Sequence, residues 1–210
     1  MLRSIVLQSR WWVALITASL ALPAFAQLEI TISSGSARAI PAAFVPFGWQ
    51  GAPGSTAPFD VAGLIEQDLR NSGYFEPLDR RDMISRPTQA AQVNFQDWRI
   101  VDVDMLLIGQ MTQTGTDQFE IAFQLFDVIR GTAIVQNRLP TTRDRLRADS
   151  HRIADMIFEE ATGIRGVFST SIAYITEERR SPTDRMFRLF VADADGFNAQ
   201  AIGPKPQKTL

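Results

Sequence analysis

The sequence predicts an α/β domain in which helices pack on a mixed sheet, followed by the first strands of a second, repeated unit. Two segments, 61–72 and 142–162, place apolar residues at helical spacing along one face. Between them, three runs from 103 to 139 alternate or are uniformly apolar, as strands are. From 171 onward the pattern indicates only short antiparallel strands, and so few strands cannot bury a core alone. Units that need neighbours in this way are typical of a repeat.

Residues 1–26 have the pattern of a secretory signal peptide. Positive charge at Arg3 precedes an apolar segment, Trp11–Leu22, and Ala24–Ala26 supplies the small residues of a cleavage site. The apolar segment is shorter than the ~20 residues that a helix needs to span a bilayer. An uncleaved anchor is the competing interpretation. We expect export, with a mature chain that begins at Gln27.

Composition restricts the function classes. Without residues 1–26 the chain has 19 basic and 23 acidic residues, a net charge of −4, so there is no basic excess for nucleic acid or anionic lipid. The chain has no cysteine, which excludes disulfides, a thiol nucleophile and a Cys/His zinc site. The exported domain must therefore be stable from its packed core.

The mature chain is predicted to begin with a short strand on a flexible joint. Apolar and polar residues alternate from Leu28 to Ser33, and turn residues follow. A terminal strand with unpaired N–H and C=O groups can add to the sheet of another protein. An edge strand of the domain's own sheet is the alternative. The candidate partner-binding residues are Gln27, Leu28, Glu29, Ile30, Thr31, Ile32, Ser33, Ser34 and Gly35.

The next segments predict a strand, a loop and a helix. Ile40–Phe47 is an apolar run typical of a buried strand, and Gly48–Pro58 is a glycine- and proline-rich loop. The loop fits neither phosphate-binding glycine pattern, although such a position after a strand could hold a small ligand. Asp60 is predicted to cap helix 61–72, and Gly73 to end it. A short strand follows.

A polar loop with a short helical turn is predicted for 79–94, after which Asn94 caps a short helix. Val103–Gly109 is uniformly apolar apart from one aspartate and is bounded by turn residues, which favours a strand buried on both faces. Phe119–Leu125 alternates, and Ala133–Leu139 pairs back after a turn. These segments predict a three-stranded meander.

The second long helix is predicted to start at a Thr142 cap and to end at Gly163. Beyond it we predict strands 171–176 and 185–192, a turn at Asp193–Gly196 and a third strand within 197–202. The predicted divisions are 1–26 as signal peptide, 27–163 as the α/β domain, 164–202 as an incomplete repeat unit, and 203–210 as a polar tail.

Groups that could carry chemistry are sparse. His151 is the only histidine, and a lone histidine on a helix is predicted to be structural. Asp193 and Asp195 are similar to half of a calcium loop, but the closing glutamate is missing, so we expect a solvated turn. The basic stretch Arg143–Arg147 is predicted to be a solvated face. We therefore expect no catalytic residue, metal or cofactor; an exported hydrolase or small-ligand-binding domain is the alternative.

Several stretches resemble one known family, in sequence order. Asp68–Phe75 matches the pattern D-L-x-x-S-G-x-F, and His151–Gly166 matches H-x-x-x-D…E-x-x-T-G-x-x-G. The chain thus resembles the TolB family of the Tol–Pal envelope system. The other matching stretches are Leu28–Gly35, Ile40–Pro41, Val45–Phe47, Asp104–Gln110, Ile172–Tyr174 and Asp193–Gly196.

The resemblance implies an α/β domain followed by a β-propeller, of which 164–202 is the incomplete first blade. It implies a periplasmic adaptor with no enzyme activity, no cofactor and no small-molecule substrate. The implied partners are TolA, through the mature N-terminal stretch, the lipoprotein Pal, chiefly through the propeller, and other outer-membrane or peptidoglycan-associated proteins. The implied role is outer-membrane integrity and invagination at division.

The family's propeller is several times longer than 171–202, and its repeated W-S-P-D-G turns do not occur in this chain. We therefore expect a truncated chain in which binding to Pal is weakened and the segment Ser171–Ile202 is poorly ordered or prone to aggregate, because no neighbouring sheet covers it.

Overall fold

The computed structural model describes residues 38–179, 181 and 184–203. The predicted signal peptide, the stretch Gln27–Gly35 and the tail from residue 204 lie outside this part of the chain. All statements on structure below concern the described residues.

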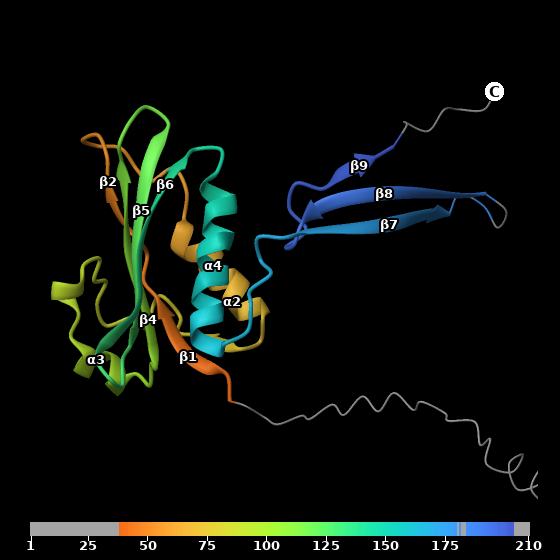
Figure 1. Ribbon diagram of the computed structural model, residues 1–210. Helices are drawn as coiled ribbons and strands as arrows, with labels where there is room; N and C mark the ends of the chain where they lie inside the picture. The colour runs from red at the N-terminus through yellow and green to blue at the C-terminus, as the bar shows by residue number, and fades with distance from the viewer. Residues whose placement is uncertain (1–37, 180, 182–183, 204–210) are drawn as a thin grey trace, which may run out of the picture. The chain divides into compact units, whose positions relative to one another are not determined.

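A mixed sheet forms the centre of the α/β domain, with strands in the order β3-β1-β4-β5-β6 and β2 beside β4 (Figure 1). β1 is parallel to β3 and to β4, whereas β4, β5 and β6 are antiparallel neighbours. This confirms the mixed α/β sheet and the three-stranded meander predicted from the sequence. The strands are β1 (Ile40–Phe44), β2 (Gly48–Gln50), β3 (Phe75–Pro77), β4 (Met105–Gln113), β5 (Gln118–Asp127) and β6 (Thr132–Thr142).

Helices cover both faces of this sheet. α2 (Val61–Asn71) and α4 (Leu146–Thr162) pack on one face, where their apolar residues share a buried cluster with β4 and β5. The short helix α3 (Phe95–Ile100) covers part of the other face, and its Trp98 is fully buried there (Figure 1). A single 3₁₀ turn, Ala90–Gln92, lies in the loop before α3, as predicted.

The caps predicted for α2 and α3 are confirmed. A carboxylate oxygen of Asp60 accepts a hydrogen bond from the Gly63 N–H at 2.9 Å, so one of the unpaired amides of the first turn is satisfied. Asn94 accepts from the Gln96 N–H at 3.2 Å at the start of α3. Gly73 follows α2 with φ +75°, a left-handed conformation that glycine adopts without a Cβ clash.

The strand predicted at 103–109 is shifted to β4, Met105–Gln113, and it is buried on both faces as expected. Leu107 belongs to the cluster under α2 and α4, and Leu106 belongs to the cluster under α3. Neighbouring residues of a strand point to opposite faces of the sheet. An uninterrupted apolar run therefore contributes side chains to two cores.

The strand predicted for Ile40–Phe47 is shorter than expected, because β1 ends at Phe44. Pro46 has no N–H to donate to the ladder. The chain then pairs again as β2, with Gly48 opposite Gln110, in a segment predicted to be loop. A Cβ on Gly48 would lie 2.9 Å from the Thr88 methyl carbon, so glycine allows this close approach.

The start predicted for the second long helix was wrong by three residues, because the helix cap is Arg145 and not Thr142. Thr142 is the last residue of β6 and not a helix cap, since its carbonyl accepts from the Arg145 N–H in a turn before α4. The end of α4 is as predicted: Gly163 has φ +72°, and its N–H donates to the Glu159 carbonyl at 2.7 Å.

A second, three-stranded antiparallel sheet follows the α/β domain and is consistent with an incomplete propeller blade. It is built from β7 (Ser171–Arg179), β8 (Arg185–Asp193) and β9 (Gln200–Ile202). β7 runs to Arg179, beyond its predicted end at Thr176, because it pairs with β8 as far as Arg185. β8 begins at Arg185 as predicted and ends one residue later than predicted, at Asp193. Within the described residues, no helix combines the length and apolar character that crossing a membrane requires.

Candidate functional site

The predicted partner-binding stretch Gln27–Gly35 lies outside the described residues and stays a prediction. The described chain begins at Arg38, whose guanidinium lies 3.4 Å from the Asp102 carboxylate, and enters the sheet at β1. β1 has β3 on one side and β4 on the other. Strand edges that are open in the described part belong to β2, β3 and β6. If residues 27–33 pair with the domain's own sheet, they must do so at one of these edges.

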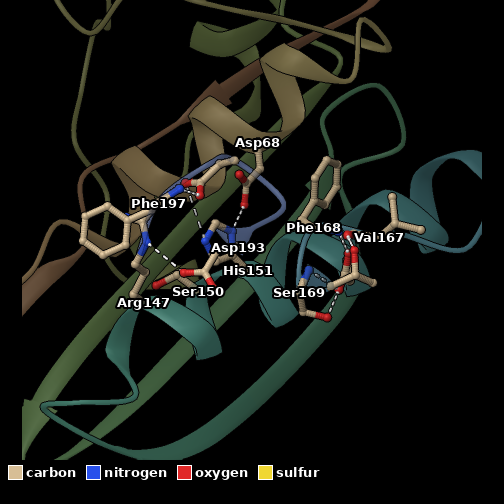
Figure 2. Close-up of polar contacts among 12 residues, drawn as sticks. Asp68, Arg147, Ser150, His151, Val167, Phe168, Ser169, Asp193 and Phe197 are labelled. Atoms are coloured by element: carbon tan, nitrogen blue, oxygen red, sulfur yellow. Dashed lines mark hydrogen bonds and ion pairs between the residues drawn. The ribbon is translucent and has the colours of Figure 1, made fainter. Parts of the chain in front are cut away.

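Charged side chains from three elements meet where α2, α4 and the turn after β8 come together (Figure 2). Five of them, and one aromatic ring, contact one another within this small region. We name the group the junction cluster; its members are Asp68 of α2, Arg147 and His151 of α4, Asp193 at the end of β8, and Asp195 and Phe197 of the turn that follows.

His151 lies at the centre of the junction cluster. Its Nδ1 is 2.6 Å from a carboxylate oxygen of Asp68, and both side chains are almost completely buried (Figure 2). Its other ring nitrogen, Nε2, is buried and lies 3.8 Å from the Asp195 carboxylate. That distance is too long for a hydrogen bond, and Nε2 has no other partner among the described residues. The ring therefore stands between two carboxylates from different parts of the fold.

Arg147, one helical turn before His151 on the same face of α4, holds the turn after β8. Its guanidinium forms an ion pair with Asp195, and its Nε lies 3.9 Å from a carboxylate oxygen of Asp193. The same guanidinium stacks over the Phe197 ring, 4.0 Å from the ring centroid. A cation over an aromatic face is attracted by the ring quadrupole. Charge and ring together fix the turn on α4.

The expectation of a solvated surface was wrong for the side chains of Arg147 and Asp195, whereas those of Arg143 and Arg145 are exposed as predicted. The Asp195 side chain is 9% exposed and that of Arg147 is 24% exposed. The sequence predicted the turn correctly, since Gly196 has φ +83° and its N–H donates to the Asp193 carbonyl. It could not show that α4 covers the aspartate side chain, because that contact joins residues 48 positions apart.

The surroundings of His151 change its protonation. Burial alone lowers the pKa of His151, but the hydrogen bond to Asp68 and the charges of Asp68 and Asp195 outweigh burial and the repulsion by Arg147. The pKa of His151 is therefore raised above its ordinary 6.5. The junction cluster favours the imidazolium form, which carries a positive charge between the two carboxylates.

Asp155, also on α4, holds the segment that leads from the helix to the second sheet. Its carboxylate accepts hydrogen bonds from the N–H groups of Phe168 and Ser169, at 2.7 and 3.1 Å, and from the Ser169 hydroxyl. Gly166 packs directly on the same residue, because a Cβ there would lie 2.5 Å from the Asp155 Cα. The connection between α4 and β7 thus has a defined path (Figure 2).

The polar groups next to His151 are engaged in contacts within the fold. Ser150, the hydroxyl next to His151 in sequence, donates to the Leu146 carbonyl at 2.7 Å. In the described part of the chain, no three histidine, cysteine or carboxylate side chains are grouped to hold a metal ion. The groups instead suit an ionic and aromatic contact between two structural elements.

The sequence singled out His151, Asp193 and Asp195 one at a time but did not predict that their side chains lie together. Asp68 entered only as part of a matching motif. The one local signal was the spacing of Arg147 and His151, which places them one turn apart on a helix. A basic pair at that spacing indicates that a carboxylate binds there, but it does not show which carboxylate.

These features define an α/β protein in which helices cover both faces of a mixed sheet, and a second, antiparallel sheet contacts α4 through the junction cluster. A family model described as the TolB amino-terminal domain matches residues 28–134. The chain belongs to the TolB family.

Individual relatives extend the match beyond that region. The chain is 42% identical over 191 residues to the Tol-Pal system protein TolB of Thioalkalivibrio sulfidiphilus, covering 91% of this chain and 43% of that protein. It is 45% identical over 167 residues to that of Pseudomonas aeruginosa, covering 80% and 38%. The crystal structure of TolB from Acinetobacter baumannii superposes with a TM-score of 0.65 at 29% identity, covering 78% of this chain and 38% of that one. The chain thus spans about two fifths of the length of these relatives.

Proposed function

We propose that this protein is a periplasmic protein–protein adaptor of the Tol–Pal system. It would support outer-membrane integrity and invagination during division, and it would act without catalysis. The observation that carries the proposal is the 42% identity to a protein named for that system across 91% of the chain.

The proposal assigns TolA to the mature N-terminal stretch, Gln27–Gly35, and Pal chiefly to the propeller, with the α/β domain as residues 27–163. The stretch has the alternation of a strand that can be added to a partner's sheet. The described sheet supports this assignment indirectly, because both sides of β1, the strand nearest to the stretch in sequence, are already paired. Other outer-membrane or peptidoglycan-associated proteins are further proposed partners.

The hydrolase alternative has no support in the described residues. The only histidine of the chain contacts Asp68 and faces Asp195, and the neighbouring Ser150 hydroxyl donates to a helix carbonyl. A nucleophile must lie within hydrogen-bond reach of its base. An adaptor role requires no such pair.

Substitution in the N-terminal stretch tests the assignment of TolA. Ile30→Asp should weaken TolA binding about tenfold or more, because burial of one isoleucine is worth about 1.5–3 kcal/mol and 1.4 kcal/mol is tenfold. Thr31→Ala, on the opposite side of the predicted strand, is the matched control and should change affinity little. Isothermal titration calorimetry with purified TolA gives both values.

Deletion of residues 27–33 distinguishes this proposal from the edge-strand alternative. If the stretch is a free binding strand, the deletion abolishes TolA binding and leaves the melting temperature unchanged. A large loss of melting temperature, or unchanged TolA affinity, would show that the stretch belongs to the domain's own sheet or has another role.

A further inference from the structure

We propose that the junction cluster is a proton-dependent latch, which seats the Asp193–Gly196 turn on α4 when His151 carries a proton and loosens the turn when His151 is neutral. The latch acts within this chain and does not depend on which partner protein binds.

The geometry places His151 where its charge acts on two elements at once. Nδ1 contacts Asp68 of α2 at 2.6 Å, and Nε2 faces Asp195 of the turn at 3.8 Å. Asp68 holds the ring on the α/β domain through Nδ1. A proton on Nε2, the nitrogen that faces the turn, therefore acts on the turn. A neutral ring with its proton on Nδ1 presents a lone pair to the Asp195 carboxylate, whereas the imidazolium presents an N–H.

The charges around the ring favour the seated turn more strongly when the ring is protonated, in addition to the ion pair between Arg147 and Asp195. The charged groups that face the ring are Asp68 from α2, Arg147 from α4 and Asp195 from the turn, while Asp193 at the end of β8 contacts Arg147. Two carboxylates against one guanidinium leave a surplus of one negative charge, which a proton on His151 neutralises. Because Asp68 and Asp195 are almost covered from solvent, water screens this surplus poorly.

The direction of the pH effect follows from the same contacts. The pKa of His151 in the folded protein is raised above 6.5, because Asp68 and the charge of Asp195 outweigh burial. The contribution of Asp195 depends on the seated turn, so the proton binds more tightly when the turn is seated than when it is loose. The stabilisation is present while His151 is protonated and is lost as the pH rises through its folded pKa, so the turn is held more tightly below that pKa than above it.

The contacts of Asp155 keep the second sheet anchored to α4 when the turn is loose. Asp155 binds the N–H groups of Phe168 and Ser169, and His151 takes no part in these contacts. Loss of the latch loosens the turn on α4, but the turn stays attached to the start of β7, because the Ala194 N–H donates to the Thr170 carbonyl at 3.0 Å. The segment Phe168–Ser169, just before β7, stays attached to α4. We therefore expect the second sheet to change its orientation about this anchor and not to detach.

The first test measures the pKa of the ring by NMR. His151 is the only histidine of the chain, so its imidazole signals do not overlap with those of another histidine. We expect a pKa above 6.5 in the intact protein and a lower pKa in Asp195→Asn. Asp184→Asn, in the other turn of the same sheet, is the matched control and should leave the pKa of His151 unchanged. Equal pKa values in the wild type and Asp195→Asn would overturn the proposal.

Distances between spin labels provide the second test, since the chain has no cysteine of its own. Cysteines placed at the exposed positions Glu160 of α4 and Arg188 of β8 report the orientation of the second sheet. The distance distribution should be narrow below pH 6.5 and should broaden as the pH rises through the pKa of His151. His151→Gln, which cannot carry the charge, should give one broad distribution at every pH. A wild-type distribution that does not change with pH, or the same pH response in His151→Gln, would refute the latch.

Discussion

Asp155 shows how a single carboxylate can fix the path of the chain between a helix and a sheet. It accepts two backbone hydrogen bonds and one from a hydroxyl, all within the segment Phe168–Ser169. Backbone N–H groups next to a carboxylate form charge-assisted hydrogen bonds, which are stronger than neutral ones. The H-x-x-x-D motif includes Asp155, but the sequence of α4 does not show which groups this carboxylate contacts.

We predict that Asp155→Ala lowers the free energy of unfolding by about 1–3 kcal/mol, because two backbone donors lose their acceptor. Urea denaturation followed by circular dichroism measures the change. Glu159→Ala, an exposed acidic residue one turn further along α4, is the control and should stay within about 0.5 kcal/mol of the wild type. Equal losses in the two variants would mean that the contacts of Asp155 contribute nothing specific.

At the scale of elements, β4 connects the two cores of the α/β domain. It lies between β1 and β5, and β2 pairs with its far end. Leu106 and Leu107 are both 0% exposed, yet they belong to different buried clusters. A strand in the middle of a sheet with helices on both faces has no polar side, and its sequence therefore shows no alternation.

We predict that Leu106→Ala and Leu107→Ala each cost about 2–5 kcal/mol of stability, since each leaves a cavity in a packed core. Domains of this size are stable by only about 5–15 kcal/mol, so either variant should melt at a clearly lower temperature. Leu189→Ala in β8, where the side chain is 41% exposed, is the control with the same chemical change and should cost less. If only one of the β4 variants were destabilised, one of the two cores would not contribute to folding.

At the scale of the whole molecule, the α/β domain and the second sheet differ in how much of their apolar surface is exposed to solvent. The domain buries its large apolar residues in two clusters, whereas the second sheet leaves Ile175 68% and Phe187 62% exposed. Ile175 is paired with Leu189, and Phe187 lies two residues away on the same strand, so the three lie on one face. Exposed apolar faces of this kind associate in solution.

We predict that the 210-residue chain self-associates at concentrations of about 100 µM, where exposed apolar surface drives aggregation. The double substitution Ile175→Thr and Phe187→Thr should return it to a monomer in sedimentation velocity runs. Arg188→Thr, on the opposite face of β8, is the control and should leave association unchanged. A wild-type chain that is monomeric at that concentration would contradict the prediction.

Much of the fold could be predicted from local patterns. The caps at Asp60 and Asn94, the glycines that end α2 and α4, and the meander all depend on residues close together in the sequence. Such signals are physical properties of short segments, because a cap or a turn satisfies its own backbone. The errors occurred where a distant segment determines the structure of a short one. β2, for example, forms because β4 lies beside it.

The candidate site was predictable only in part. The alternation at Leu28–Ser33 suggested a binding strand, and that stretch lies beyond the described residues. His151, Asp193 and Asp195 stood out individually, but a lone histidine and a turn with two aspartates are each common in solvated positions. Their importance here comes from mutual contact, which periodicity and spacing do not encode.

The sequence by itself determined the class of fold, the mixed order of helices and strands, and the membership in the TolB family, since these follow from hydrophobic period, caps, turns and matching motifs. Only the tertiary structure decided that Asp68 meets His151 across 83 positions and that Asp195 lies under Arg147 across 48. The physical reason is that burial and pairing of charges depend on which surfaces pack together. Packing is a property of the assembled elements and cannot be assigned to any one of them.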